Sequence, residues 1–229
     1  MAGMISPSAA ISDARLLGAG FAGASWNRWK AVLKAAYAEP LDDAERALFH
    51  EVAEREPPTR PVKELWVIGG RRSGKDSIAS AIATIAAISD YQPFLRPGER
   101  ATVMCLACDR EQARILRRYI GASFASVPLL MPLVSRQTED GIELVSGVEI
   151  VVGTNSFRAV RGRSFACCIF DEVAYWRDET TSNPDAEVYA AVMPGMATLP
   201  GLLVGISSPY RKCLSGRLAS HLNRLRERA

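Results

Sequence analysis

A glycine-rich stretch between a short apolar run and a long apolar helix constrains the fold of this chain more than any other feature. Trp66–Ile68 is typical of a strand end, Gly69–Gly74 of a turn, and Ile78–Ile88 of a helix. A phosphate-binding loop requires this order of elements. Gly69, four intervening residues, Gly74 and Lys75 fill the first seven positions of the signature G-x-x-x-x-G-K-S/T. The sequence therefore predicts a loop that binds phosphate.

Three properties of this stretch suit a nucleoside triphosphate. Glycines allow the backbone to fold around a phosphate with its N–H groups turned inward. The N-terminus of the following helix adds partial positive charge, and Lys75 supplies an ammonium for the β- and γ-phosphates. We expect the chain to bind ATP through Gly69, Gly70, Arg71, Arg72, Ser73, Gly74, Lys75, Asp76 and Ser77.

The eighth position of the signature departs from the pattern. It usually holds a Ser or Thr whose hydroxyl binds Mg²⁺, but here it is Asp76. A carboxylate could ligate Mg²⁺ in place of the hydroxyl, although it brings negative charge close to the phosphate oxygens. Ser77 comes one position too late to replace it.

Two adjacent carboxylates give a second chemical signal. Asp171 and Glu172 follow the apolar run Phe165–Phe170, which predicts a buried parallel strand with both acids at its carboxyl end. Open α/β sheets bind their ligands at that end. We expect Asp171 to hold Mg²⁺ through its water shell, and Glu172 to orient and deprotonate the attacking water.

The remaining patterns place these two signals in one α/β domain. Strands are expected over residues 101–107 and 202–209, the latter ending in hydroxyls, and a hairpin over 141–153. Helices are expected over residues 25–38, 41–54, 109–124 and 185–199, with Asp109 as the cap of the third. In the first of these, Trp26, Trp29, Leu33 and Tyr37 lie near helical spacing, so we expect this face of the helix to contact the core. The prediction is a P-loop NTPase three-layer sandwich with a mainly parallel sheet, in which the phosphate-loop strand and the acidic strand lie near the centre.

Charge and composition divide the chain into three parts. Residues 1–60 are expected to form an N-terminal arm and helices packing on the core, with residues 1–24 held loosely. Residues 61–210 are expected to form the ATPase core. Residues 211–229 are expected to form a basic tail, because positive charge is concentrated there although the whole chain carries only +3. The charged residues of the tail are Arg211, Lys212, Arg217, Arg224, Arg226 and Arg228 against Glu227.

The cysteines and the hydropathy indicate a reduced, cytoplasmic setting without a membrane span. The chain has five cysteines, an odd number, and no signal peptide is evident. Cys105 and Cys108 have C-x-x-C spacing but lie in an apolar strand, so we expect buried small side chains rather than zinc ligands. Only two histidines occur, which argues against a histidine-rich metal site. The apolar helix Ile78–Ile88 is too short to span a bilayer.

Taken together, residues 40–210 resemble the ATPase domain of the large terminase subunit, the motor that pumps viral DNA into the proheads of tailed phages. The resemblance rests on the glycine-rich loop from Gly69 to Lys75, on Arg161-Gly162 before the run that ends at Asp171 and Glu172, and on Ser207-Ser208-Pro209.

This resemblance implies further roles and partners. Arg71 resembles the loop arginine that contacts the γ-phosphate. Arg161, which lies between Arg158 and Arg163, resembles an arginine supplied to the ATP of a neighbouring subunit. Ser207 and Ser208 resemble the motif that couples hydrolysis to movement. The implied partners are double-stranded DNA, further copies in a ring on a portal, and a small terminase subunit, in the host cytoplasm. Large terminases continue into a nuclease domain after the coupling motif, whereas this sequence ends about twenty residues after Ser207 and Ser208. We therefore expect no nuclease activity from this chain.

Two alternatives remain open from the sequence. The chain could be another P-loop DNA-dependent ATPase, of a helicase-like or recombinase type. It could also be a nucleotide-binding module in which Asp76 permits binding without turnover.

Overall fold

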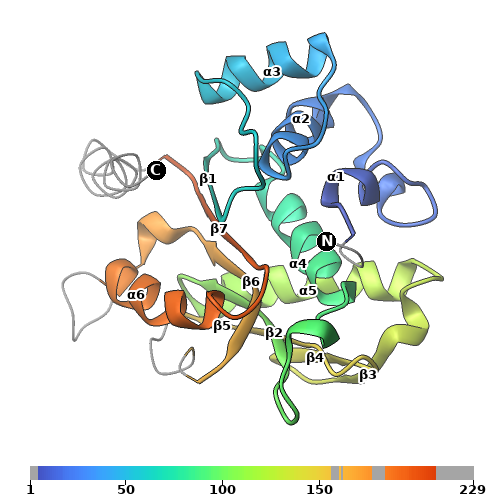
Figure 1. Ribbon diagram of the computed structural model, residues 1–229, viewed down its shortest axis with the longest axis vertical. Coiled ribbons are helices and arrows are strands. Elements are labelled where there is room, and N and C mark those ends of the chain that lie inside the picture. The colour runs from blue at the N-terminus through green and yellow to red at the C-terminus, as the bar shows by residue number, and fades with distance from the viewer. Residues whose placement is uncertain (1–4, 156–159, 161, 177–183, 210–229) are drawn as a thin grey trace.

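One mixed sheet organises the computed structural model, which describes residues 5–155, 160, 162–176 and 184–209. Its seven strands are β1 (Glu64–Ile68), β2 (Ala101–Ala107), β3 (Val134–Gln137), β4 (Gly141–Leu144), β5 (Glu149–Thr154), β6 (Ser164–Asp171) and β7 (Leu202–Ser207). Their spatial order is β1-β7-β6-β2-β5-β4-β3 (Figure 1). The first five strands of this order pair in parallel, whereas β4 pairs antiparallel with both β5 and β3.

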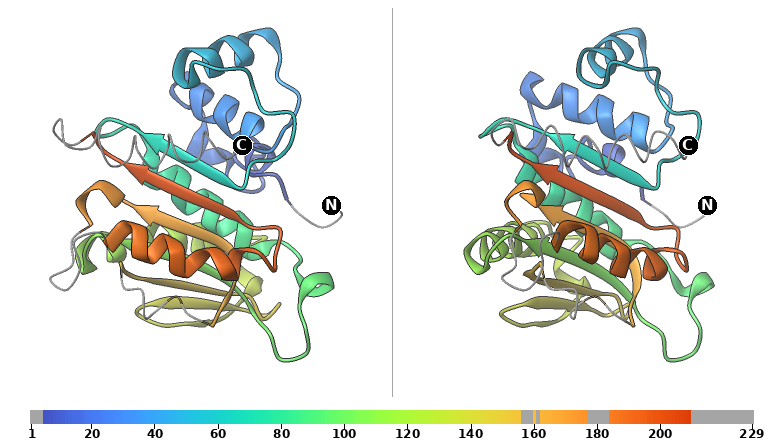
Figure 2. Two further views of the ribbon diagram at one scale, coloured as in Figure 1. Left: turned by 60° about the vertical axis from the view of Figure 1, so that its left-hand side comes forward. Right: turned by 90° about the vertical axis from the view of Figure 1, so that its left-hand side faces the viewer.

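Helices cover both faces of the sheet. α4 and α5 pack on one face and α6 on the other, which confirms the predicted three-layer α/β sandwich (Figure 2). The α-helices are α1 (Pro7–Ala10), α2 (Asn27–Ala36), α3 (Asp43–Ala53), α4 (Lys75–Ile88), α5 (Arg110–Ser126) and α6 (Pro184–Met196). Short 3₁₀ helices are η1 (Gly18–Phe21), η2 (Ala24–Trp26), η3 (Gln92–Phe94), η4 (Met131–Leu133) and η5 (Val173–Tyr175).

The central strands are buried on both faces, as the continuous apolar runs predict. In β2, Val103 and Cys105 point into the core beneath α4 and α5, whereas Met104 and Leu106 point into the core beneath α6. This alternation follows from the two-residue period of a strand. Apolar residues at every position are therefore needed to bury both faces.

The position of β1 differs from the expectation. The sequence predicted the phosphate-loop strand near the centre of the sheet, but β1 is an edge strand whose one partner among the described strands is β7. β6, the acidic strand, does lie inside the sheet, between β7 and β2. Nothing in the local pattern of β1 distinguishes an edge from a centre, because helix packing also buries part of an edge strand.

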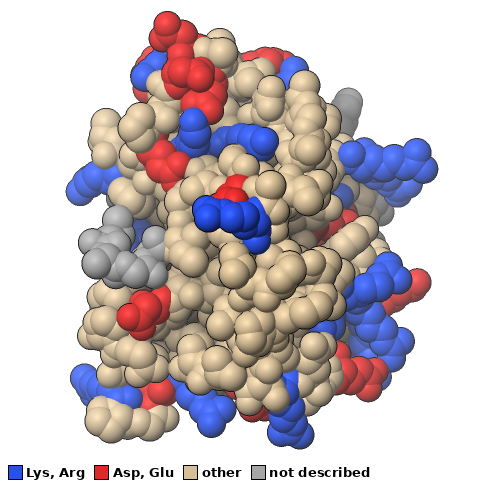
Figure 3. Space-filling view, turned by 90° about the vertical axis from the view of Figure 1, so that its right-hand side faces the viewer, with Lys and Arg blue, Asp and Glu red and all other residues tan. Residues whose placement is uncertain are grey.

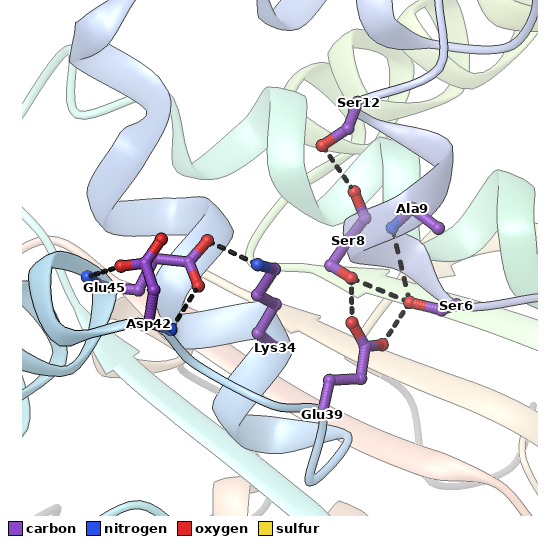
Figure 4. Close-up of polar contacts among 8 residues, drawn as sticks. All are labelled: Ser6, Ser8, Ala9, Ser12, Lys34, Glu39, Asp42 and Glu45. Atoms are coloured by element: carbon purple, nitrogen blue, oxygen red, sulfur yellow. Dashed lines mark hydrogen bonds and ion pairs between the residues drawn. The ribbon is translucent and has the colours of Figure 1, made fainter.

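The first residues of the chain also differ from the expectation. Residues 1–24 were expected to be held loosely, yet within the described part of this stretch Ala10, Ile11 and Phe21 are buried in the core. α1 is tied to the turn after α2 by Glu39, whose carboxylate accepts hydrogen bonds from Ser6 and Ser8 (Figure 4). The weak pattern of this segment hid its packing, because small residues bury well without a strong hydrophobic period.

Smaller differences concern element boundaries. The hairpin is formed by β4 and β5, and Asp109 caps α5 as expected. β3 was not anticipated, because its sequence is polar and mostly exposed. Pro194 lies inside α6 without ending it.

Cysteine burial agrees with the expectation except at Cys108, which lies just beyond the end of β2. Cys105, Cys167 and Cys168 are fully buried free thiols, and Cys108 is half-buried. Burial raises the pKa of the Cys167 thiol to about 12, so it stays protonated. In the part of the chain that the structure describes, no helix has the length and apolar character needed to cross a membrane.

Gly205→Ala should destabilise the protein, because a Cβ there would lie 2.1 Å from the Trp66 ring in the adjacent strand. We expect a loss of about 1–3 kcal/mol in the free energy of unfolding, measured by urea denaturation. Gly153→Ala is the matched control, since a Cβ at that strand position meets nothing within 4 Å. Equal effects of the two substitutions would contradict the close packing of β7 against Trp66.

Candidate nucleotide-binding site

The glycine-rich loop connects β1 to α4 at the carboxyl edge of the parallel strands. Gly74 has φ of 81° and directly precedes Lys75, the first residue of α4. The Gly69 amide donates to the Ser207 carbonyl at 3.0 Å, which fixes the start of the loop to the end of β7. The first amides of a helix have no partner within the helix, so the start of α4 borders the loop with the kind of donors that anion binding at a helix N-terminus requires.

Lys75 joins this loop to the acidic strand. Only 7% of the residue is exposed, and its Nζ lies 3.0 Å from Glu172 Oε1 and 3.9 Å from Asp76 Oδ1. A buried ammonium needs such partners, because leaving it unpaired in the interior would cost several kcal/mol. The two sequence signals, separated by almost a hundred residues, thus meet in one ion pair.

Glu172 is also held by the end of β7. Its carboxylate accepts hydrogen bonds from the Ser208 amide at 2.7 Å, the Ser208 hydroxyl at 2.8 Å and the Ser207 hydroxyl at 3.3 Å. Its backbone is left-handed, with φ of 48°. Burial raises the pKa of the Glu172 carboxyl, but the hydrogen bonds from Ser208 and Lys75 outweigh burial and hold the pKa below its ordinary value. Glu172 is therefore a fixed carboxylate.

Asp171 has the opposite electrostatic environment. The residue is 3% exposed, and its Oδ1 has no hydrogen-bond partner among the described residues. Burial, and then the negative charges of Asp76 and Glu172, raise the pKa of the Asp171 carboxyl to about 7 despite the opposing effect of Lys75. Three carboxylates thus surround one ammonium. The excess negative charge and the unpaired buried oxygen fit a divalent cation.

A magnesium site here would be incomplete without its ligand. Among the described residues, no group of three or more His, Cys, Asp or Glu side chains has the geometry to hold a metal ion. Mg²⁺ is usually bound by one or two carboxylates together with phosphate oxygens and water. Asp171 and Asp76 would be the residues that hold such an ion together with a bound nucleotide.

The other expected site residues are distributed unevenly. Arg71 and Arg72 are exposed, and Ser77 is half-buried in the first turn of α4. Arg161 lies outside the described residues, as do Arg158 and the basic tail. Arg163 forms an ion pair with Glu149 of the same chain, so it is engaged at the amino end of β6.

Two residues at the loop were not anticipated as part of the site. Trp29 Nε1 donates to the Ser73 carbonyl at 2.8 Å, and the Trp26 ring lies against Gly74. The sequence predicted core contacts for both tryptophans from their helical spacing. The core contact of Trp29 is confirmed, but its position beside the loop could not be inferred from that spacing.

Fold and loop together define the class. A phosphate-type loop between an edge strand and a helix, facing an acidic strand end in a mostly parallel sheet, is the α/β fold of P-loop ATPases. No protein-family model matches the chain, and no curated protein sequence matches it either.

Solved structures do resemble it. The crystal structure of the large terminase of bacteriophage HK97 matches with a TM-score of 0.56 and 17% identity, over 88% of this chain and 37% of that protein. The large terminase ATPase domain of Thermus phage P74-26 matches with a TM-score of 0.45 and 20% identity, over 74% of this chain and 70% of the other. The structure of Dbp5 of S. cerevisiae, bound to RNA and ADP–BeF3, matches with a TM-score of 0.43 and 17% identity, over 84% of this chain and 47% of Dbp5.

The match to the HK97 protein confirms the expected structural likeness to the large terminase at the level of the fold. The HK97 match extends over most of this chain, whereas this chain spans little more than a third of the length of that protein.

Asp171→Asn should alter how the stability of the nucleotide-free protein depends on pH. The pKa of the folded carboxyl is about 7 against an ordinary value of 3.8, so the folded protein holds this proton more tightly than the unfolded chain. Folding therefore becomes less favourable as pH rises from about 4 to about 7. The variant lacks this penalty, so its stability relative to the unaltered chain should increase over that range, on the order of 4 kcal/mol, and level off above it.

Urea denaturation in EDTA at about pH 5 and about pH 8 measures this difference. The same advantage, or none, at both pH values would contradict a raised pKa at Asp171.

Proposed function

We propose that the chain hydrolyses ATP and uses the energy to translocate double-stranded DNA, as the ATPase of a viral DNA-packaging motor. The likeness to the HK97 large terminase supports this proposal over other P-loop ATPases. The partners proposed with it are further copies of the chain in a ring on a portal, and a small terminase subunit.

One observation carries the hydrolytic part of the proposal. The buried Lys75–Glu172 pair at 3.0 Å brings the phosphate loop, the acidic strand and the end of β7 to one point. A lysine that binds phosphate and a carboxylate that orients water must lie within a few ångströms of the same γ-phosphate. The distance between the two side chains meets that requirement.

The proposed roles follow from the environment of each side chain. Lys75 and the loop amides bind the β- and γ-phosphates, and Arg71 reaches the transferred charge from its exposed position on the loop. Asp171 and Asp76 hold Mg²⁺, which neutralises phosphate charge when it is bound. Glu172, with its lowered pKa, stays ionised and orients the attacking water. Arg161 of a neighbouring copy completes the charge stabilisation.

The same geometry suggests how hydrolysis is coupled to movement. Glu172 binds both the ammonium of Lys75 and the Ser208 amide and hydroxyl. A γ-phosphate that attracts Lys75 removes one of these partners, so the balance of contacts at Glu172 changes with the nucleotide. We propose that Ser207 and Ser208 transmit this change along β7.

DNA contact would involve mainly phosphates and would weaken steeply with salt. The face of the molecule in Figure 3 shows Lys and Arg beside Asp and Glu around a broad neutral area, rather than a continuous basic surface. On α5, Arg114 pairs with Glu139 at 3.2 Å, and Arg117 donates to the Thr138 and Gly141 carbonyls. From its charge in the sequence, we propose that the basic tail, residues 211–229, makes the main DNA contacts.

Asp76 favours a second candidate, a module that binds nucleotide without turnover. Its carboxylate stands where the signature has a hydroxyl, and its charge contributes to the raised pKa of Asp171. A poorly ionised Asp171 would bind Mg²⁺ weakly, so nucleotide binding could persist while hydrolysis is slow.

ATP hydrolysis by the purified chain tests the proposal. We expect Mg²⁺-dependent turnover that Lys75→Ala abolishes and linear double-stranded DNA stimulates. Glu172→Gln should still bind ATP but turn over about 10²–10⁴ times more slowly, because the carboxylate that orients water is lost. Glu143→Gln is the matched control, since Glu143 pairs only loosely with Arg136, at 3.7 Å on the far strands. Unchanged turnover in Glu172→Gln would remove Glu172 from its role.

Asp76→Ser separates the two candidates. The substitution restores the signature hydroxyl and removes one of the charges that raise the pKa of Asp171. If Asp76 only takes the place of the hydroxyl at the magnesium ion, Mg²⁺-dependent hydrolysis should be preserved. If Asp76 instead suppresses turnover, as in the second candidate, hydrolysis should rise. Asp90→Ser, beyond the other end of α4, should leave the rate of hydrolysis unchanged. Complete loss of activity in Asp76→Ser would show that the carboxylate itself is required.

A further inference from the structure

The phosphate loop is contacted from outside the sheet by residues that precede β1. We call residues 5–53, which include α1, α2 and α3, the N-terminal segment. Trp29, in α2, donates its indole N–H to the Ser73 carbonyl at 2.8 Å, across 44 positions of sequence. Trp26, at the end of η2, covers Gly74: a Cβ on that glycine would lie 2.6 Å from the Trp26 ring. In Figure 1, α2 lies above the end of α4 from which the loop emerges.

These two tryptophans are themselves held firmly. Trp29 is 9% exposed and belongs to the same core as α4. The Trp26 ring meets Phe21 edge to face, with ring centroids 4.8 Å apart. Glu39 ties α1 to the turn after α2, and Lys34 of α2 pairs with Glu45 of α3 at 2.5 Å (Figure 4). The N-terminal segment is therefore a packed unit, able to hold a loop in place.

Peptide geometry shows what the Trp29 contact does to the loop. The carbonyl of Ser73 and the N–H of Gly74 belong to one planar trans peptide, so they point in opposite directions. Because Trp29 holds the carbonyl towards α2, the Gly74 N–H is turned away from α2. The Ser73 hydroxyl lies over Gly69 and, among the described residues, has no hydrogen-bond partner although it is buried. The orientation of this peptide thus depends on Trp29.

We propose that Trp29, supported by Trp26, is a positioning residue for nucleotide: it holds the Ser73–Gly74 peptide so that the Gly74 amide faces the bound phosphate. The inference rests on the proposed binding of nucleotide at the loop but not on hydrolysis. Coupling between two sites is reciprocal, so phosphate bound at the loop stabilises the docked N-terminal segment by the same free energy.

Trp29→Phe tests the role, because it keeps an aromatic ring and removes only the indole N–H. We expect its Kd for ADP, measured by calorimetry, to rise about tenfold, since the freed peptide must be reoriented and the Ser73 carbonyl loses its partner. Trp66→Phe is the matched control: its indole N–H donates to Glu64 at 2.8 Å, near the far end of β1. Both variants lose one indole hydrogen bond, but only Trp29→Phe should weaken ADP binding.

Hydrogen exchange on the unaltered chain gives a test that needs no variant to fold. Saturating ADP should slow amide exchange both at residues 69–77 and at residues 24–36. Protection of the loop alone, or an unchanged Kd in folded Trp29→Phe, would overturn the positioning role while leaving nucleotide binding intact. Failure of the unaltered chain to bind ADP would overturn this inference together with the proposed function.

Discussion

The site depends on one buried ammonium that faces three carboxylates. Lys75 offsets part of the negative charge of Asp76, Asp171 and Glu172, and its contact with Glu172 holds the loop against the ends of β6 and β7. Such a cluster is stable only while its charges are paired, because an unpaired charge in the interior costs several kcal/mol. Burial, and then the charges of Asp76 and Glu172, raise the pKa of the Asp171 carboxyl. Hydrogen bonds from Ser208 and Lys75 outweigh burial at Glu172 and lower its pKa, so the two neighbouring carboxyls shift in opposite directions.

The sequence predicted the parts of the site that lie within single elements. The loop from Gly69 to Lys75 and the strand ending at Asp171 each carry a local signal, since a turn needs glycine and a buried strand needs an apolar run. The contacts between elements could not be predicted from the sequence. That Ser208 binds Glu172 follows from the insertion of β7 between β1 and β6, and no residue in any of those strands encodes their order in the sheet.

The N-terminal segment shows a second limit of sequence reasoning. Amphipathic spacing correctly placed Trp29 and Leu33 in the core, but a hydrophobic period says which face is buried and not what that face meets. Ala10 and Ile11 gave no usable signal, because α1 is only four residues long and leaves no hydrophobic period to detect. The glycine-rich loop is therefore covered on its outer side by Trp26 and Trp29, which are not part of the sequence motif.

The position of β7 in the sheet has a consequence for folding during synthesis on the ribosome. β1 pairs with β7, the last described strand, in a register that joins Glu64 to Leu203. While the chain is being synthesised, the strand that carries the phosphate loop therefore has no neighbour until nearly all of the domain has emerged. Pairings between segments so distant in sequence form late, because loop closure costs entropy before any contact is gained. A nascent or prematurely ended chain that lacks β7 would contain the glycine-rich motif, but Gly69 would lack its partner Ser207 and Glu172 would lack its partner Ser208.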